Sequence, residues 1–533
     1  MRRIHVSLLL TLSLAWSSGC PTGGIMPVPP NVITGPLSPL HAVPDTAAGG
    51  RFEDALGRQV LLRGANVNSL GEYWTFDPDV APVFPLVADE VDLFAGIGWN
   101  VVRMILTWSL VEPSPGEYDA AYLDAVEDAV RLFQSRGIYT LIDLHQDAWG
   151  PTLAARADET CPTDTSPAIG WDGAPGWATL DGGASRCIRT GTFGLREFSP
   201  AVVAAFLAFW SDQEGPGGVG IQTRYHAMLG HLAARFSPFD SVIGYDVMNE
   251  PNAWSSITLA LAAPGQGLDD QTATLSTFYS RAQAAIRQAE TDARTPHRMI
   301  FIEPSPDWAV STELAVLPYF QHDDQLVYAP HIYQGGITPG GLSEGAFQDA
   351  MDDAATFRGA PILTGEWGTG PTRATDPDDD YFERHQDFQD QFRMSSALWQ
   401  FRVGCGDPHA ASDPYQGVDP GMWGLFDVDC PSNQTLGFRE DFARVLRRPL
   451  LRAAPGPIDA VRWDRQTGTF QASGTQATSG QELVLFLPVP VAVGDFEASG
   501  LAGLAPGTVE GPGQLWTAAA TGGAWQIRVL QLP

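Results

Sequence analysis

The chain has 533 residues, 44% of them hydrophobic and 17% charged, so it is long enough for a large barrel domain with a further domain attached. Its 31 basic and 62 acidic residues give a formal net charge of −31, which argues against nucleic acid or an anionic membrane surface as a partner. Every one of the 31 basic residues is arginine, and the lack of lysine excludes Schiff-base enzymes and lysine-dependent P-loop enzymes.

The first 20 residues have the features of an export signal. Two arginines precede an apolar run over residues 4–16, which is too short to span a bilayer. Small residues then lead to Cys20, an arrangement that resembles a bacterial lipoprotein signal. We expect lipidation at Cys20, with plain cleavage or a buried thiol as alternatives, followed by a Pro/Gly-rich tether over residues 21–50. The protein is therefore predicted to be exported, either secreted or held at the cell surface.

Eight short apolar runs alternate with helical patterns between about residues 60 and 447. The runs cover residues 60–67, 100–106, 139–145, 242–248, 299–304, 326–331, 361–367 and 396–401. Apolar residues at helical spacing lie between them, for example over residues 120–134, 271–290 and 344–357. This alternation predicts an α/β fold, a (β/α)8 TIM barrel within residues 51–449. The alternative is an open doubly wound sheet, but the GxGxxG fingerprint that would favour it is missing.

Long irregular inserts follow the third and the eighth predicted strands, at residues 146–196 and 403–436. In a barrel, both inserts belong to the face on which the strands end. After residue 449 the pattern changes to alternating apolar and polar residues separated by turn residues. Residues 450–533 are therefore predicted to form a small antiparallel β-sandwich.

Four cysteines lie within the inserts as two sequence-neighbour pairs, Cys161 with Cys187 and Cys405 with Cys430. An even number of cysteines in an exported chain favours disulfides. A zinc site would require a CxxC pattern or a nearby histidine pair, and neither appears. We expect each neighbouring pair to form a disulfide.

Polar side chains stand at the C-terminal tips of the predicted strands, which converge on one face of a barrel. Glu250 follows the strand at 242–248, and Glu366 ends the strand at 361–367. Paired carboxylates cut glycosidic bonds, because one protonates the leaving oxygen while the other attacks the anomeric carbon. The other tip residues are Arg103, His145, Asn249, His331, Tyr333 and Trp399. Each alone has an ordinary structural explanation, and only their conjunction at successive tips indicates an active site.

These tips carry motifs that resemble family 5 glycoside hydrolases of clan A over about residues 55–447. The motifs are NEP at 249–251, HIY at 331–333, GEW at 365–367 and LWQF at 398–401. Within that family, DLHQDAWG at 143–150, GAPGWAT at 173–179 and the appended β-sandwich resemble the endoglycoceramidase branch.

The resemblance implies a retaining hydrolase that cleaves the glycan–ceramide bond of glycosphingolipids. It makes Glu250 the acid/base and Glu366 the nucleophile, gives the other six tip residues supporting positions, and places Asp147 in contact with the terminal sugar. It implies no cofactor and no metal. We expect a monomer whose contact with membranes is limited to the N-terminal lipid anchor and to presentation of the substrate.

One departure from that branch concerns the loop after the first strand, residues 66–78. Members that act on glucosylated sphingolipids carry a lysine there, and this chain does not. A galactosyl-first or a different β-glycoside therefore stays open as the substrate. So do a carbohydrate-only substrate, as for a family 5 endo-β-glucanase or β-glucosidase, and a non-catalytic surface glycan-binding lipoprotein.

The aromatic residues of the inserts predict an apolar, lipid-facing side of the substrate cleft. Exposed aromatic patches on a soluble domain mark binding sites. We expect this side to be formed by Trp149, Trp171, Trp177, Met422 and Trp423.

Overall fold

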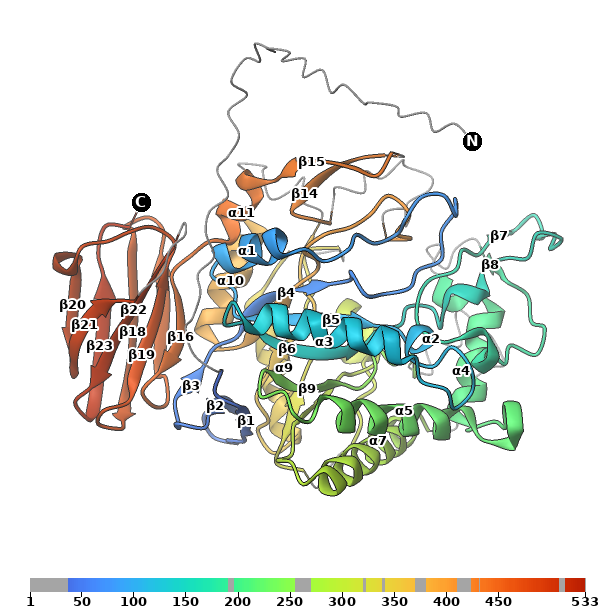
Figure 1. Ribbon diagram of the computed structural model, residues 1–533, viewed down its shortest axis with the longest axis horizontal. Coiled ribbons are helices and arrows are strands. Elements are labelled where there is room, and N and C mark those ends of the chain that lie inside the picture. Colours follow the sequence, from blue (N-terminus) through green and yellow to red (C-terminus); the bar gives the residue numbers. More distant parts are fainter. Residues whose placement is uncertain are drawn as a thin grey trace, which may run out of the picture.

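The computed structural model describes residues 37–189, 196–254, 270–319, 323–337, 341–369, 380–409, 423–430, 432–507 and 513–532. The expected export signal, the lipidation site Cys20 and Met422 lie outside these ranges. Within them the chain forms a barrel surrounded by helices, with a β-sandwich beside it (Figure 1).

Eight parallel strands form the barrel, in the spatial order β11-β10-β9-β6-β5-β4-β13-β12. A parallel bridge between Tyr328 and Ile362 joins β11 to β12, so the two ends of the sheet meet. The strands are β4 (Arg63–Val67), β5 (Val101–Leu106), β6 (Tyr139–Leu144), β9 (Val242–Asp246), β10 (Met299–Ile302), β11 (Leu326–Tyr328), β12 (Leu363–Thr364) and β13 (Ser395–Leu398). All their residues are buried, as expected for parallel strands covered on both faces. The predicted (β/α)8 barrel is confirmed.

Helices follow the strands and cover the outside of the barrel (Figure 1). They are α1 (Ala88–Gly96), α2 (Trp108–Val111), α3 (Ala120–Gln134), α4 (Pro200–Trp210), α5 (Ile221–Phe236), α7 (Gln271–Ala293), α8 (Asp307–Val310), α9 (Glu344–Thr356), α10 (Tyr381–Gln391) and α11 (Glu440–Leu446). Helix α3 has the predicted bounds because Asp119 caps it, accepting a hydrogen bond from the Tyr122 amide, while its apolar stripe is buried. Of the helices in the described part of the chain, none combines the length and apolar character needed to cross a bilayer.

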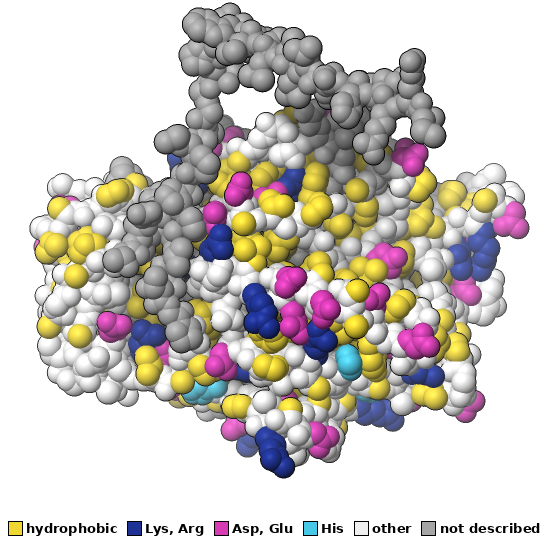
Figure 2. All heavy atoms as spheres, viewed as in Figure 1, with side chains coloured by type: hydrophobic (Ala, Val, Ile, Leu, Met, Phe, Trp, Pro, Cys, Tyr) yellow, Lys and Arg dark blue, Asp and Glu magenta, His cyan; other side chains and the backbone are white. Residues whose placement is uncertain are grey.

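The C-terminal region forms two antiparallel sheets, in agreement with the predicted sandwich. One has the order β17-β18-β23-β20, and the other has the order β1-β2-β3-β16-β19-β22-β21. The C-terminal strands are β16 (Leu450–Ala454), β17 (Ala460–Asp464), β18 (Thr469–Ala477), β19 (Glu482–Leu487), β20 (Phe496–Ser499), β21 (Leu501–Pro506), β22 (Gln514–Ala520) and β23 (Gly523–Val529). Charged side chains gather mainly over the barrel on the face shown in Figure 2, and few lie on the sandwich.

Three strands from the N-terminal segment complete the larger sheet. Their positions change two predicted boundaries, the end of the tether and the start of the barrel. These are β1 (Leu40–Val43), β2 (Arg51–Asp54) and β3 (Gln59–Val60). The tether was expected to reach residue 50, but Leu40 and Ala42 are buried in the same apolar cluster as the first residues of the barrel strands. Residues 51–60 were assigned to the barrel, yet β3 pairs with β16 of the sandwich. Burial of alternate apolar residues against the barrel bottom is the physical reason for both corrections.

The sandwich lies on the side of the barrel where the strands begin. Arg452 of β16 donates hydrogen bonds to the carbonyls of Gly98 and Trp99, which lie just before the start of β5. Phe486 of β19 lies against Gly98 so closely that a Cβ there would come within 2.4 Å of its ring. The sandwich therefore packs away from the face on which the strands end, and it stabilises the barrel without lining that face.

Both inserts lie on the strand-end side and carry the predicted disulfides. The Cα atoms are 5.6 Å apart in Cys161–Cys187 and 5.6 Å apart in Cys405–Cys430, so both pairings are confirmed. The first insert contains η1 (Pro151–Leu153), β7 (Thr165–Pro167), η2 (Gly176–Ala178), β8 (Cys187–Arg189) and η3 (Arg196–Phe198). The second contains the hairpin β14 (Phe426–Asp429) and β15 (Gln434–Phe438).

Candidate active site

Glu250 and Glu366 face each other at the end of the barrel. Glu250 lies beyond β9 and Glu366 beyond β12, and a carboxylate oxygen of each lies within 4.8 Å of the other. Retaining glycosidases hold their two carboxyl groups about 5–5.5 Å apart, whereas inverting enzymes need about 6.5–9.5 Å to admit a water. The close approach of these oxygens fits direct attack on carbon.

Two donors bind the carboxyl group of Glu366. The Tyr333 hydroxyl donates to its Oε2 at 2.8 Å, and Arg103 Nη1 donates to its Oε1 at 3.0 Å. Hydrogen bonds that involve a charged group such as Arg103 are stronger than neutral ones, so these contacts fix the orientation of the carboxyl group. Only 7% of the Glu366 side chain is exposed, so the oxygens have few other partners. Arg103 and Tyr333 thus both contact the carboxyl group of Glu366 directly.

Glu250 lies in a different environment that favours its protonated form. Burial raises the pKa of Glu250 to about 7, an effect that the Glu366 charge increases and the hydrogen bond to His331 opposes. His331 Nδ1 lies 2.9 Å from Glu250 Oε1. Glu250 has a φ of 41°, in the left-handed region that a non-glycine residue occupies only when its surroundings hold it there. Glu250 and Glu366 therefore lie in different surroundings, as the separate roles of an acid and a nucleophile require.

His331 lies between Glu303 and Glu366, in space that the backbone of Gly365 leaves open. Its Nε2 lies 3.3 Å from Glu303 and its Nδ1 lies 3.5 Å from Glu366. A Cβ at Gly365 would come within 2.9 Å of His331 Nε2, so the glycine of the GEW motif is required sterically. Burial alone lowers the pKa of His331, but the charges of Glu303 and Glu366 raise it well above its usual value.

Arg103 is fully buried and organises the floor of the site. Its guanidinium donates to Glu366, to Asn249 Oδ1 at 2.9 Å and to Asn66 Oδ1 at 2.9 Å. It also pairs with the carboxylates of Asp143, Asp246 and Glu303, each at 3.0 Å. The Asn249 amide is held at both ends, since its Nδ2 donates to the Gln146 carbonyl. Burial raises the pKa of Asp246 well above its usual value, and the Glu303 charge adds to this rise, so fewer negative charges surround the arginine.

Glu303 is a site residue that the sequence interpretation did not select. Its Oε2 accepts the Glu250 amide at 2.8 Å, and its Oε1 accepts from Arg103 at 3.0 Å. It follows β10 directly, so the strand-tip rule that selected the other residues applies to it as well. It was passed over because no motif partner accompanied it.

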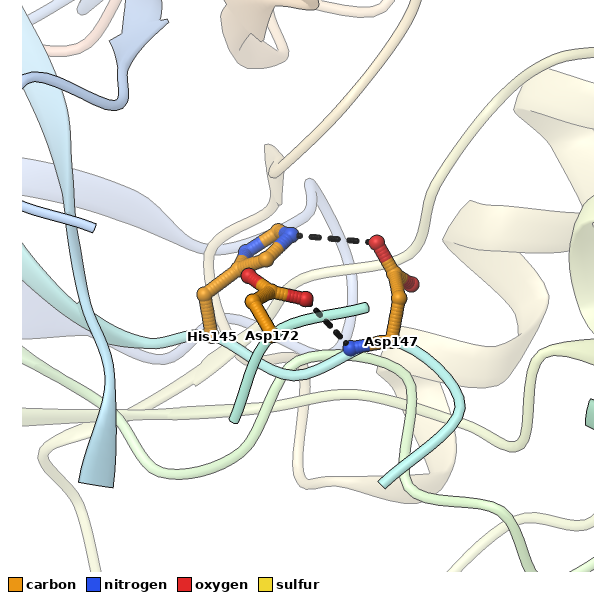
Figure 3. Close-up of side chains that lie close together, drawn as sticks. All are labelled: His145, Asp147 and Asp172. Carbon is orange, nitrogen blue, oxygen red and sulfur yellow. Dashed lines mark hydrogen bonds and ion pairs between the residues drawn. The ribbon is translucent and has the colours of Figure 1, made fainter. Parts of the chain in front are cut away.

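His145 and Asp147 form the side of the site next to Trp399. His145 stacks on Trp399 with ring centroids 5.2 Å apart, and its Nδ1 lies 2.7 Å from Asp143. Its Nε2 points to Asp147 at 3.5 Å, while the Asp147 amide donates to Asp172 Oδ1 at 2.9 Å (Figure 3).

Two groups of residues in the described part of the chain bring three candidate metal-ligand atoms within 4.8 Å, namely His145 with Asp147 and Asp172, and Glu250 with His331 and Glu366. The second contains the two facing glutamates. Beside the first, His409 lies 3.3 Å from Asp147, and the Arg196 guanidinium stacks 3.2 Å above the Trp171 ring. A nearby guanidinium repels a divalent cation, so this group is suited to hydrogen bonding.

The structure corrects the membership of the predicted apolar side of the cleft. Trp149 and Trp171 are 2% and 1% exposed, so the expectation that they face a lipid is wrong. Trp149 packs in the core against Phe206 and Phe209. Trp177 and Trp423 are partly exposed. Trp423 packs with Ala309 against a cluster formed by Ile105, Tyr333 and Trp399. An apolar wall therefore adjoins the nucleophile, but it is formed by fewer insert residues than expected.

A barrel with two facing glutamates at its strand ends defines a glycoside hydrolase of the retaining type. Residues 86–403 match Cellulase (glycosyl hydrolase family 5). The chain therefore belongs to glycosyl hydrolase family 5, as its motifs predicted.

Relatives of this chain are known by sequence and by structure. Endoglycoceramidase I of Rhodococcus hoagii (strain 103S) is 27% identical over 307 residues, which cover 56% of this chain and 54% of the relative. The match thus spans about half the length of that protein. Endoglycoceramidase of Cyanea nozakii is 24% identical, over 67% of this chain and 69% of the relative. A solved endogalactoceramidase is 34% identical with a TM-score of 0.78, over 93% of this chain and all of that chain.

Proposed function

We propose that this protein hydrolyses the bond between the glycan and the ceramide of glycosphingolipids by a double displacement. Glu250 protonates the leaving oxygen while Glu366 attacks the anomeric carbon, and Glu250 then activates the water that releases the sugar. The distance between the two carboxylates and the opposite environments of Glu250 and Glu366 support this assignment.

The observation that carries the lipid part of the proposal is the apolar wall beside the nucleophile. Tyr333 and Trp399 are shared between that wall and the catalytic site, and Trp423 extends it. Large apolar side chains are also exposed in described segments that follow strand ends; these are Phe76, Val310, Ile337 and Leu436. A cleft for a purely carbohydrate substrate does not need such a surface.

A galactose attached directly to ceramide is the favoured first sugar. The loop at 66–78 has no lysine, and the 34% identity to an endogalactoceramidase supports the same choice. The alternative is a carbohydrate-only substrate, which the buried positions of Trp149 and Trp171 favour.

A substrate panel separates these possibilities. Galactosyl- and glucosyl-linked glycosphingolipids, cello-oligosaccharides and nitrophenyl β-glycosides are incubated with the protein, and the products are identified by mass spectrometry. Release of intact glycan and ceramide from the galactosyl-linked lipids supports the proposal. Turnover confined to cello-oligosaccharides would refute it.

We also propose that the protein is exported and carries a lipid at Cys20. The charged and apolar pattern of residues 1–20 and the two disulfides support export, because disulfides persist in oxidising compartments.

A further inference from the structure

A carboxylate on the sugar-facing side of the site is held by residues from both inserts. Asp147 lies just beyond β6, and its side chain is 17% exposed. Its Oδ2 accepts the Trp171 indole N–H at 2.6 Å and lies 3.5 Å from His145 Nε2. From the second insert, His409 Nε2 reaches the same oxygen at 3.3 Å.

His409 is fixed by a second carboxylate on its other nitrogen. Its Nδ1 lies 2.8 Å from Asp407 Oδ1, and its own amide also donates to that oxygen at 2.8 Å. Asp407 is fully buried, and Asn68 from the loop after β4 donates to its Oδ2 at 3.0 Å. An imidazole that faces a carboxylate with each nitrogen donates with both, which makes it an imidazolium.

The charge state of the cluster follows from this geometry. Burial alone would lower the pKa of His409, but the Asp407 charge and the hydrogen bonds to both acids raise it to about 9. In the opposite direction, burial would raise the pKa of Asp147, and its bonds to His145 and His409 lower it far below the usual value. Burial raises the pKa of Asp172 to about 8, so its carboxyl is protonated near neutral pH. Asp147 is thus the ionised acid on this side of the site.

His409 also contacts aromatic residues that lie beside the catalytic site. Its ring lies 4.8 Å from Trp399 and 4.5 Å from Trp171, centroid to centroid. Trp399 in turn stacks on His145 beside the catalytic glutamates. Behind Asp147, Gln146 donates to the carbonyls of Asn249 and Glu250, so a shift of this loop would reach the acid/base.

We propose that His409, held by Asp407, is a positioning residue that fixes Asp147 with one oxygen fully bonded and the other presented to the hydroxyls of the first sugar. This role rests on the proposed action on a β-glycoside and is independent of whether the aglycone is ceramide. A carboxylate fixed in this way can accept hydrogen bonds from sugar hydroxyls with no free-energy cost of reorientation during the reaction. It also makes sugar recognition depend on the second insert, although neither the barrel strands nor Glu250 and Glu366 belong to that insert.

The test is a double-mutant cycle on the full-length protein. The variants are His409→Gln, Asp147→Asn and the double variant, with Asp407→Asn as a second way to release the histidine. His297→Gln is the matched control, because His297 is exposed and lies before β10, on the side of the barrel where the strands begin. The readouts are kcat/KM on a nitrophenyl β-galactoside and calorimetric affinity for a galactose-configured iminosugar, which binds without turnover.

His409→Gln should lower both kcat/KM and affinity by about 10- to 100-fold, the range of one charge-assisted hydrogen bond. Asp147→Asn should lower them at least as much, and the double variant no further than about twofold below Asp147→Asn. Asp407→Asn should lower kcat/KM and iminosugar affinity in the wild-type background but not in the Asp147→Asn background. This second cycle tests the same coupling if His409→Gln folds poorly.

Two results would overturn the proposal. One is an effect of His409→Gln no larger than that of His297→Gln, and the other is a double variant whose losses multiply. Because iminosugar binding is measured without turnover, a protein that binds the sugar normally but cleaves no glycoside would contradict the proposed function and not this inference.

Discussion

Glu303 Oε2 accepts the backbone amide of Glu250 at 2.8 Å, and this bond holds the acid/base at its left-handed φ of 41°. The same carboxyl group accepts a hydrogen bond from Arg103 and lies 3.3 Å from His331. It therefore contacts both the arginine that binds Glu366 and the histidine that binds Glu250. A buried acid that touches the backbone of the catalytic residue sets its geometry without entering the chemistry.

Glu303→Gln should lower kcat/KM by about 10- to 100-fold while the protein stays folded, because a neutral amide forms weaker bonds to Arg103 and the Glu250 amide. Steady-state kinetics and thermal unfolding measure the two effects. The exposed Glu313, in the short helix η5 (Thr312–Leu314), provides the control substitution Glu313→Gln. Equal kinetics for both variants would contradict a positioning role.

The second prediction concerns the pH dependence of the acid step. The pKa of Glu250 is raised to about 7, so its carboxyl group is protonated below that pH. Above that pH the group is deprotonated and can no longer act as the general acid. On a substrate with a poor leaving group, kcat/KM should therefore fall as the pH rises through about 7. In Glu250→Gln this limb should disappear. A limb that persists unchanged in the variant would assign the titration to another group.

The third prediction concerns the nucleophile and the stereochemistry. Glu366→Ser should abolish hydrolysis without changing thermal unfolding, since no other carboxylate replaces the one held by Tyr333 and Arg103. With the wild-type protein, proton NMR of the first product formed should show the β-anomer. Appearance of the α-anomer first would require a water between the carboxylates and an inverting mechanism.

The fourth prediction separates the acid from the base role of Glu250. Glu250→Ala should still form the glycosyl intermediate from a dinitrophenyl glycoside, because that leaving group needs no proton. Added azide should then accelerate turnover and yield the β-glycosyl azide, detectable by mass spectrometry. If azide has no effect on this variant while the substrate is still consumed, Glu250 is not the base.

The fifth prediction concerns the insert that bears Asp172. Replacing Cys161 and Cys187 with serine should lower stability by about 3 kcal/mol, the value expected for a closed loop of this length. Calorimetric unfolding with and without reductant measures it. The wild type should shift toward the variant under reducing conditions, and an unchanged transition would show that the insert is held without this bond.

Export can be tested in a bacterial host. The wild-type protein should partition with membranes and incorporate a labelled fatty acid, whereas Cys20→Ser should release it into the soluble fraction. A wild-type protein that appears soluble and unlabelled outside the cell would indicate plain cleavage.

The sequence predicted the barrel and the catalytic pair because each strand is a continuous apolar run that ends in a polar residue. Glu250, Glu366, Arg103 and Tyr333 meet where the strand-tip rule places them. The strands β1 to β3 were not predicted, since runs of two to four residues carry no readable alternation. Asp172, Asp407 and His409 were missed because they lie in irregular inserts, where no periodicity connects position in the chain with position in space. Trp149 and Trp171 were misplaced for the same reason.

The pairing of β3 with β16 has a consequence for how the protein assembles. Val60 lies opposite Ala453 in this pairing, and the next amide, that of Leu61, donates to the Arg452 carbonyl at 3.3 Å, so distant parts of the chain share one sheet. Contacts between such distant positions form slowly, because the loop between them must close first. While the chain is being made, the hairpin that covers the barrel bottom has an open edge until the final strands arrive. We therefore expect folding to be completed only after synthesis ends, and a chain truncated before β16 to expose that edge and aggregate.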